Sequence, residues 1–193
     1  MSKQNFFKKG NLKISYRYYK RSKKTLIFLH GLLSDMSGKK SNFLNNYCKK
    51  NNFSYLCFDF QGHGRSSGEF TNFGISDWYD DLDNIVKYLK IRNFILIGSS
   101  MGGWVAIIYA LMHPKKVTKL IGIAPAPDFT DKLIWKKFNI HQRNKIKQNK
   151  IVKQKVSSDF TYYYSPALFI RSKKYLLEKV KGDFLGETIF LHG

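Results

Sequence analysis

Short apolar runs alternate with amphipathic segments along most of the chain, as expected where strands alternate with helices. The runs that predict buried strands are Leu12–Tyr19, Thr25–Leu29, Phe53–Phe60, Phe94–Ile97, Lys119–Ala124 and Glu187–Leu191. The segments that predict helices are Ser41–Asn51, a stretch with Ser76 as its N-cap, and Ser100–His113. Strands joined through helices favour an α/β fold with a mostly parallel, doubly wound sheet.

The pattern changes after Asp128. Residues 131–181 contain 14 Lys or Arg against 3 Asp or Glu, together with an aromatic cluster from Phe160 to Tyr164. We interpret residues 129–182 as a helical, lid-like insertion over a core of residues 25–128, although a solvated basic surface with a few core anchors fits the same composition. Residues 183–193 then begin a late core strand, and residues 1–193 form a single domain.

Three of the predicted strands end in polar, glycine-bearing loops. These loops are His30–Gly38, Asp59–Gly68 and the turn at Ser100. Ligands of open parallel sheets bind at the carboxyl ends of the strands, where such loops meet. We therefore expect the three loops to form one shared site.

The sequence Gly98-Ser99-Ser100-Met101-Gly102 has the G-x-S-x-G spacing of a nucleophile turn, with Ser100 as the candidate nucleophile. The serine has to stand on a strained strand-to-helix turn, and glycines on either side let the strand and the helix approach closely. The helix that follows directs its free N–H groups toward developing negative charge. A glycine-rich turn fits the pentapeptide alone, but the strand before it and the helix after it favour the nucleophile.

The net charge of +21 admits two interpretations. A basic protein can bind nucleic acid or an anionic membrane surface. The lysines, however, are spread over the whole chain, and the aromatic residues are interleaved with aliphatic ones as a core requires. We favour a compositional bias, and we expect no specific nucleic-acid partner.

The remaining composition indicates a globular protein of a reducing compartment. No apolar run is long enough to span a bilayer, and no apolar segment of a signal peptide follows the basic residues 1–24. Cys48 and Cys57 are the two cysteines, and they lack the spacing of a metal site. We expect buried thiols, a cytoplasmic location, and neither a metal nor a cofactor.

Several motifs together resemble the α/β-hydrolases. The dipeptide His30-Gly31 is similar to the oxyanion loop of that family, and Asp59-x-x-Gly62-His63-Gly64-x-Ser66 is similar to the loop after its next strand. With Gly98–Trp104 and Ala124–Thr130, Ser34–Gly38 resembles one subfamily, which includes mitochondrial palmitoyl-protein thioesterases, acyl-glucuronide esterases and bacterial relatives. The resemblance is dense from about Thr25 to Thr130.

The resemblance implies a serine hydrolase that cleaves an ester or thioester of a small acyl substrate through an acyl-enzyme. Ser100 would be the nucleophile, and the backbone N–H groups of Leu32 and Met101 would form the oxyanion hole. The family order of serine, acid and histidine places the base downstream, so we expect His63 to be structural or near the pocket.

The sequence after Ser100 contains no clear candidate for the catalytic acid or for the catalytic histidine of this family. In the family the acid usually follows the strand that we predict at Glu187–Leu191, so we expect the sequence to be truncated at its C-terminus and to lack the last strand and helix. Asp128 is the possible acid within the chain, with a loop-capping or lid-anchoring role as its alternative. The other histidines are weaker candidates for the base: His113 by its distance, His141 in the basic insertion, and His192 at the end of a strand.

Two further functions remain open. A chain that lacks its catalytic base would have little activity, so it could instead be a non-catalytic hydrolase-fold protein that binds a ligand or a partner. The third possibility is a basic protein that binds nucleic acid or a membrane surface. The sequence leaves the oligomeric state and the physiological substrate open.

Overall fold

The computed structural model describes residues 4–158 and 161–192. The first residue of the predicted aromatic cluster, Phe160, lies outside the described residues, as do residues 1–3 and 193 of the predicted terminal segments. Among the described residues, no helix is both long and apolar enough to cross a membrane.

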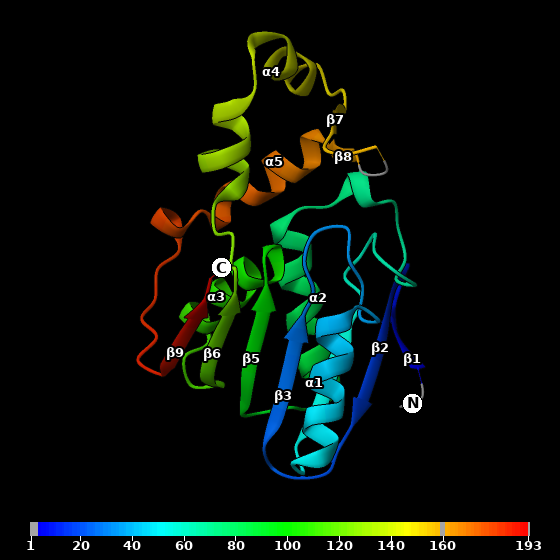
Figure 1. Cartoon of the computed structure of the whole chain (residues 1–193), viewed down its shortest axis with the longest axis vertical. Helices are drawn as coiled ribbons and strands as arrows, with labels where there is room; N and C mark the ends of the chain where they lie inside the picture. The colour runs from blue at the N-terminus through cyan, green and yellow to red at the C-terminus, as the bar shows by residue number, and fades with distance from the viewer. Residues whose placement is uncertain (1–3, 159–160, 193) are drawn as a thin grey trace.

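Seven strands form the central sheet (Figure 1). They are β1 (Gln4–Lys9), β2 (Leu12–Tyr19), β3 (Thr25–Leu29), β4 (Ser54–Phe58), β5 (Phe94–Ser99), β6 (Val117–Ile123) and β9 (Glu187–Leu191). Their spatial order is β1-β2-β4-β3-β5-β6-β9. The β1–β2 and β2–β4 pairs are antiparallel, whereas the pairs from β4 to β9 are parallel. The sheet is therefore mostly parallel, as the sequence predicts.

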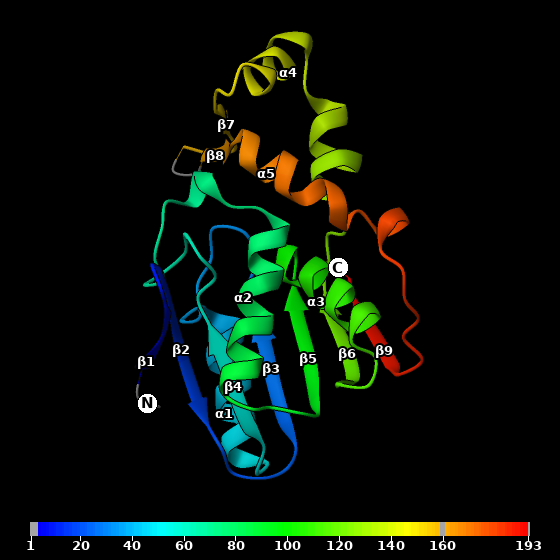
Figure 2. The ribbon, with the colours of Figure 1, turned by 180° about the vertical axis from the view of Figure 1, so that it is seen from behind.

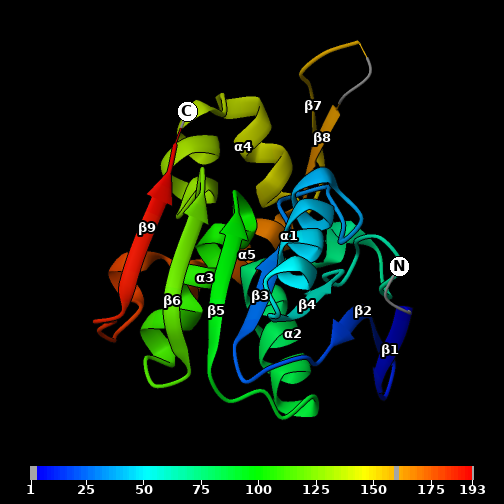
Figure 3. The same ribbon diagram turned by 60° about the horizontal axis from the view of Figure 1, so that its bottom comes forward.

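Helices cover both faces of this sheet (Figures 1 and 2). Helix α1 (Lys39–Lys50) lies over one face, and helices α2 (Ile75–Tyr88) and α3 (Met101–Met112) lie over the other. Figure 3 shows the layers from the end of the sheet at which the parallel strands begin. The carboxyl ends of β3, β5 and β6 therefore lie at one edge of the sheet, beneath the segment that follows residue 128.

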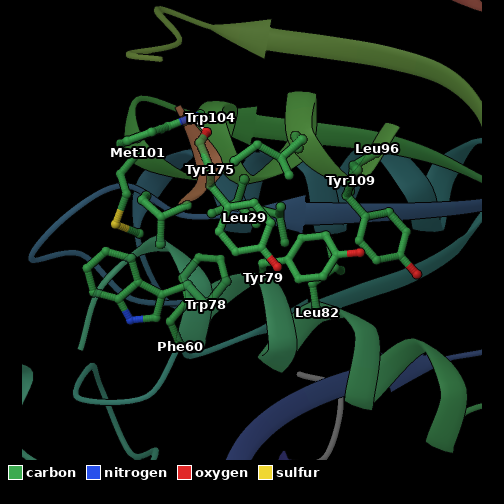
Figure 4. Packing of buried hydrophobic residues seen from close by; sticks show 14 of the residues in the cluster. Leu29, Phe60, Trp78, Tyr79, Leu82, Leu96, Met101, Trp104, Tyr109 and Tyr175 are labelled. Carbon is green, nitrogen blue, oxygen red and sulfur yellow. Dashed lines mark hydrogen bonds between the residues drawn. The ribbon is translucent and has the colours of Figure 1, made fainter. Parts of the chain in front are cut away.

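The larger part of the core lies between the sheet and helices α2 and α3 (Figure 4). Trp78 and Trp104 are fully buried there, and the Trp104 indole N–H donates to the carbonyl of Tyr175 at 3.1 Å. A buried indole nitrogen needs such a partner. This bond therefore ties the segment after residue 129 to the core helix α3.

Residues after Asp128 form a layer above the carboxyl edge of the sheet (Figure 1). The layer contains the π-helix η2 (Phe129–Trp135), helix α4 (Ile140–Lys147), strands β7 (Val152–Lys155) and β8 (Thr161–Tyr164), and helix α5 (Pro166–Ser172). Strands β7 and β8 form a separate antiparallel hairpin. We call residues 129–182 the cap.

The structure corrects several details of the sequence prediction. Helix α2 begins at Ile75 with Gly74 as its N-cap, not with Ser76, because the Asp77 carboxylate accepts the Gly74 N–H at 2.9 Å. Strand β1 and the β7–β8 hairpin were not expected. Two aromatic side chains of α1, Phe43 and Tyr47, are exposed and retain 69% and 46% of their accessible surface.

The exposure of Phe43 has a structural reason. Helix α1 packs on β3 and β4, and beside it the same face of the sheet is open over β5, β6 and β9. An apolar groove of about 540 Å³ runs there, lined by Phe43, Leu44, Ile97, Ile121, Ile123 and Leu191, with Lys39 and Lys40 at its rim. All residues of β9 are exposed, so this strand leaves one edge of the sheet open.

Asp77 offers a test of how the cap is attached to the core. Its carboxylate caps α2 and also pairs with Arg171 of α5 at 2.6 Å. We expect Asp77→Ala to lower the free energy of unfolding by about 1–2 kcal/mol, because a capping bond and a tether to the cap are lost together. Urea unfolding measures the change. Asp80→Ala, an exposed carboxylate one turn further along α2, is the control and should change stability by less than about 0.5 kcal/mol; equal effects of the two variants would contradict this role.

Candidate active site

Ser100 lies at the turn between strand β5 and helix α3 and has φ 52° and ψ −118°. A non-glycine residue with positive φ outside the left-handed helical region is strained. The strain is held by backbone bonds on both sides: the Ser100 N–H donates to the Ile123 carbonyl at 3.0 Å, and the Ser100 carbonyl accepts from Gly103 and Ala126 at 2.9 and 3.1 Å. The turn therefore lifts the side chain of Ser100 above the carboxyl edge of the sheet.

The glycine spacing around Ser100 follows from close backbone packing. A Cβ atom on Gly98 would collide with the carbonyl of Gly102, and one on Gly102 would collide with the carbonyl of His30. Only glycine fits both positions, since each contact is with backbone that cannot rotate away. The two glycines thus let strand β5, helix α3 and the loop after β3 meet at Ser100.

A cavity of about 200 Å³ opens beside Ser100. It is lined by Leu32, Ser100, Met101, Ala126, Phe129, Leu133, Ile134, Tyr162 and Tyr164. The core supplies the serine and its neighbours, and the cap supplies most of the apolar and aromatic wall. Tyr162 and Tyr164 come from the hairpin, where their rings stack at 5.6 Å.

The two expected oxyanion donors lie at this cavity. Met101 is the first residue of α3, so its N–H lies at the positive end of the helix dipole. Leu32 belongs to the loop after β3, in which a Cβ atom on Gly31 would lie 3.3 Å from the Ser100 Cβ. The structure therefore brings Leu32, Met101 and Ser100 together at one cavity.

His63 holds the loop that carries Leu32. Its Nε2 accepts the Leu33 N–H at 3.2 Å, and its Nδ1 lies 3.1 Å from the Gln61 carbonyl. Because Leu33 can only donate and the Gln61 carbonyl can only accept, the ring is neutral with its proton on Nδ1. Burial lowers the pKa of His63 to about 4, so the neutral form persists at neutral pH.

His30, in the loop after β3, makes the same two kinds of hydrogen bond as His63. Its Nε2 accepts the Phe60 N–H at 3.2 Å, its Nδ1 donates to the Gly31 carbonyl at 2.8 Å, and burial lowers its pKa to about 4. The two imidazoles lie 5.0 Å apart in an edge-on contact. Both rings therefore use both nitrogens: Nδ1 bonds within the ring's own loop, and Nε2 connects the loop 30–38 with the loop 59–68.

Two buried carboxyl groups complete this connection. Asp59 accepts the Met36 N–H at 2.8 Å and the Arg65 N–H at 3.0 Å, one from each loop. Asp81, fully buried in α2, accepts from the backbone and side-chain N–H groups of Gln61 at 2.8 and 2.9 Å. Burial raises the pKa of Asp81 to about 8. We call the contacts of His30, His63, Asp59 and Asp81 the loop clamp. The sequence analysis identified the motif that contains Asp59 and His63, but it did not predict these contacts.

Asp128 does not line the cavity, although Ala126 and Phe129 close to it in sequence do. It has left-handed backbone, φ 54°, and its Oδ1 accepts the Leu177 N–H of the cap at 2.9 Å. This bond is the loop-capping or lid-anchoring contact that the sequence analysis gives as the alternative to a triad acid.

The remaining histidines lie away from Ser100 or on the surface. His113 follows the far end of α3 and bonds to the Tyr79 hydroxyl at 2.8 Å, about 20 Å from the serine by helical rise. His141 is exposed on α4, and His192 follows β9. Over the described ranges 4–158 and 161–192, no cluster of three or more His, Cys, Asp or Glu side chains is arranged to hold a metal ion.

A family model described as "alpha/beta hydrolase fold" matches residues 24–149 of the chain. The chain belongs to this hydrolase family. The rat protein named "Palmitoyl-protein thioesterase ABHD10, mitochondrial" is 35% identical over 125 residues, which are 64% of this chain and 42% of the rat protein. The hydrolase chain thus spans less than half the length of this curated relative.

Solved structures extend the similarity over nearly the whole hydrolase chain. The mouse alpha/beta hydrolase domain-containing protein 10 matches with a TM-score of 0.86 and 24% identity, covering all of this chain and 78% of the mouse chain. A protein from Agrobacterium vitis S4 matches with a TM-score of 0.87 and 26% identity, covering 98% of this chain and 77% of the other. The expected family and fold are therefore confirmed, and the cap shares the fold of these structures.

Two substitutions at His63 separate the two bonds of its ring. His63→Asn keeps a donor toward the Gln61 carbonyl but removes the acceptor of the Leu33 N–H, which costs about 1–3 kcal/mol when the amide is left unpaired. His63→Gln keeps an acceptor toward Leu33, and the Gln61 carbonyl still has the Trp78 indole as donor at 3.1 Å. We expect hydrogen exchange at the Leu33 amide to accelerate about tenfold or more in the Asn variant and clearly less in the Gln variant.

Exchange is measured by NMR or by mass spectrometry of the peptide that contains residues 30–38. The amide of Val105, in the buried middle of α3, serves as an internal reference for global unfolding. Unchanged exchange at Leu33 in His63→Asn would contradict the assigned bond.

Proposed function

We propose that this chain carries the nucleophile, the oxyanion hole and the acyl pocket of a serine hydrolase. The observation that carries the proposal is the position of Ser100, strained at φ 52° on the strand-to-helix turn and facing a cavity shared with Leu32 and Met101. In the reaction, the Ser100 hydroxyl attacks a carbonyl carbon and forms an acyl-enzyme. The amides of Met101 and Leu32 stabilise the oxyanion, each contributing roughly 3–4 kcal/mol.

The pocket supports an acyl ester or thioester as the substrate class. Its wall is aromatic and aliphatic, from Phe129, Leu133 and Ile134 to the tyrosines of the hairpin. A volume of about 200 Å³ is below the usual 300–1,000 Å³ of drug-sized sites, which favours a small acyl group. The name of the rat relative assigns that protein a thioester substrate, and we extend a thioesterase or esterase activity to this chain on that basis.

We propose no general base among His30, His63 and His113. His30 and His63 use both ring nitrogens in the loop clamp, and His113 lies at the far end of α3. Asp128 is the candidate acid within the chain, although its bond to Leu177 favours an anchoring role. The strand β9 ends beside β6, where the Ala124 N–H bonds to the Leu191 carbonyl at 2.7 Å, so residues after β9 reach the same edge of the sheet as Ser100.

A reducing compartment is the proposed location. Cys48 and Cys57 are buried free thiols, as the sequence predicts. The name of the rat relative places that protein in the mitochondrion, and we keep the cytoplasm as the proposed location of this chain.

Covalent labelling with a fluorophosphonate probe tests the proposed nucleophile. We expect the 193-residue chain to label slowly, because His30, His63 and His113 make other contacts and do not activate the serine, and we compare it with a form extended through any coding sequence after residue 193. Ser100→Ala in the faster form should reduce labelling by about 10⁴-fold or more. Ser99→Ala, at the adjacent buried serine, is the matched control and should retain most of the labelling.

Rapid labelling of the 193-residue chain at Ser100 would place the base within it and contradict the expected slow labelling. Labelling that survives Ser100→Ala would refute the nucleophile itself. Folded forms that never label would favour the alternative of a hydrolase-fold protein that binds a ligand without turning it over.

A further inference from the structure

The positive charge of the chain is concentrated in the cap. Residues 132–158 contain nine Lys or Arg and no Asp or Glu. Residues 131–181 carry an excess of +11, which is more than half of the net +21 in about a quarter of the chain. A uniform lysine bias would spread the excess positive charge evenly along the chain. It therefore does not explain why the cap carries more than half of that charge.

The β7–β8 hairpin has two different faces. Tyr164 is buried opposite Val152 and lines the Ser100 cavity. Lys153 and Tyr163 are paired on the opposite face, where the ammonium lies 5.6 Å from the ring centre, and Lys155 follows at strand spacing. The hairpin therefore covers the cavity with one face and presents exposed cationic and aromatic side chains with the other.

Exposed aliphatic side chains lie among these lysines. Ile140 at the start of α4 and Val156 just after β7 retain 71% and 61% of their accessible surface, and Ile151 just before β7 retains 40%. On α4, Lys145 and Lys147 are exposed as well, while Ile146 is buried beneath them. Figure 1 shows α4 and the β7–β8 hairpin at the end of the molecule away from the sheet. We call their exposed lysine, aliphatic and tyrosine side chains the cap outer face: Ile140, Lys145, Lys147, Ile151, Lys153, Lys155, Val156 and Tyr163.

We propose that the cap outer face docks on an anionic phospholipid surface, with its lysines at the headgroups and Ile140, Ile151 and Val156 in the acyl boundary. Lysines attract the negative surface of a bilayer, and aliphatic side chains gain from leaving water at the interface. Nucleic acid would use the same charges, but it would gain little from branched aliphatic side chains, because bases stack on flat aromatic or guanidinium groups. The aliphatic residues therefore favour lipid over a nucleic acid.

The docking orientation has a consequence for the cavity. The hairpin that would touch the lipid is the same hairpin whose inner tyrosines line the wall at Ser100. A lipid surface in contact with Lys153 and Tyr163 would therefore be separated from the cavity only by the hairpin itself. The docking proposal stands on charge and exposure, and it does not depend on the proposed hydrolase activity.

Co-sedimentation of the 193-residue chain with vesicles tests the proposal. The vesicles contain phosphatidylcholine alone or phosphatidylcholine with phosphatidylglycerol at a three-to-one ratio. A quadruple variant, with Lys145, Lys147, Lys153 and Lys155 each changed to Gln, removes charge from the cap outer face. The matched control changes four exposed lysines at the opposite end of the sheet to Gln: Lys20, Lys23, Lys24 and Lys115.

We expect binding to the anionic vesicles only, a loss of at least tenfold in affinity for the cap variant, and less than threefold for the control. Ile140→Ser combined with Val156→Ser leaves the charge unchanged and should weaken lipid binding at least threefold. Circular dichroism confirms that each variant is folded.

Three results would overturn the proposal. One is the absence of binding to anionic vesicles at low salt. Another is an equal loss in the cap variant and the control, which would indicate a general effect of net charge. The third is that a single-stranded RNA oligonucleotide binds as tightly as the vesicles while the aliphatic double variant changes neither, which would identify a site for polyanions.

Discussion

The active-site region of this chain depends on the loop clamp between the two loops that follow β3 and β4. Leu33 and Met36 of the first loop donate their amides to His63 and Asp59 of the second, while the Phe60 amide donates to His30. Because each amide is satisfied by a buried side chain, both loops have one favoured arrangement. That arrangement places Leu32 beside Ser100, so the geometry at the candidate nucleophile depends on side chains that do not line its cavity.

The same contacts determine the chemistry of the histidines. A ring that accepts an amide N–H on Nε2 and donates from Nδ1 has no free nitrogen for a serine hydroxyl. His30 and His63 therefore hold structure rather than move protons, although both lie near the site. Burial favours their neutral forms, so the stability that these two rings contribute is lost as the pH falls from about 6.5 toward 4, where the unfolded chain binds protons first. The raised pKa of buried Asp81 acts in the opposite sense over this range, because there the folded chain holds the proton.

Local signals in the sequence predicted much of this architecture. Strands β2, β3 and β9 were predicted with the bounds that the structure gives them, because each is an apolar or alternating run between polar segments. The turn at Ser100 was predicted from glycine spacing, which reflects backbone packing. Strand β1 was missed, because its sequence is polar and basic and the strand is defined by its pairing with β2. The polar β7–β8 hairpin and the bond between Leu33 and His63, 30 residues apart, were missed for the same reason.

The protonation state of His30 and His63 tests the loop clamp most directly. Long-range ¹H–¹⁵N correlation spectra of the imidazole rings, recorded from pH 7 to pH 4, report which nitrogen carries the proton. The loop clamp predicts that both rings stay neutral from pH 7 to about pH 5, protonated on Nδ1 with Nε2 free to accept. Titration of either ring near pH 6.5, or a proton on Nε2, would contradict the bonds to Leu33 and Phe60 and with them the proposed support of the oxyanion loop.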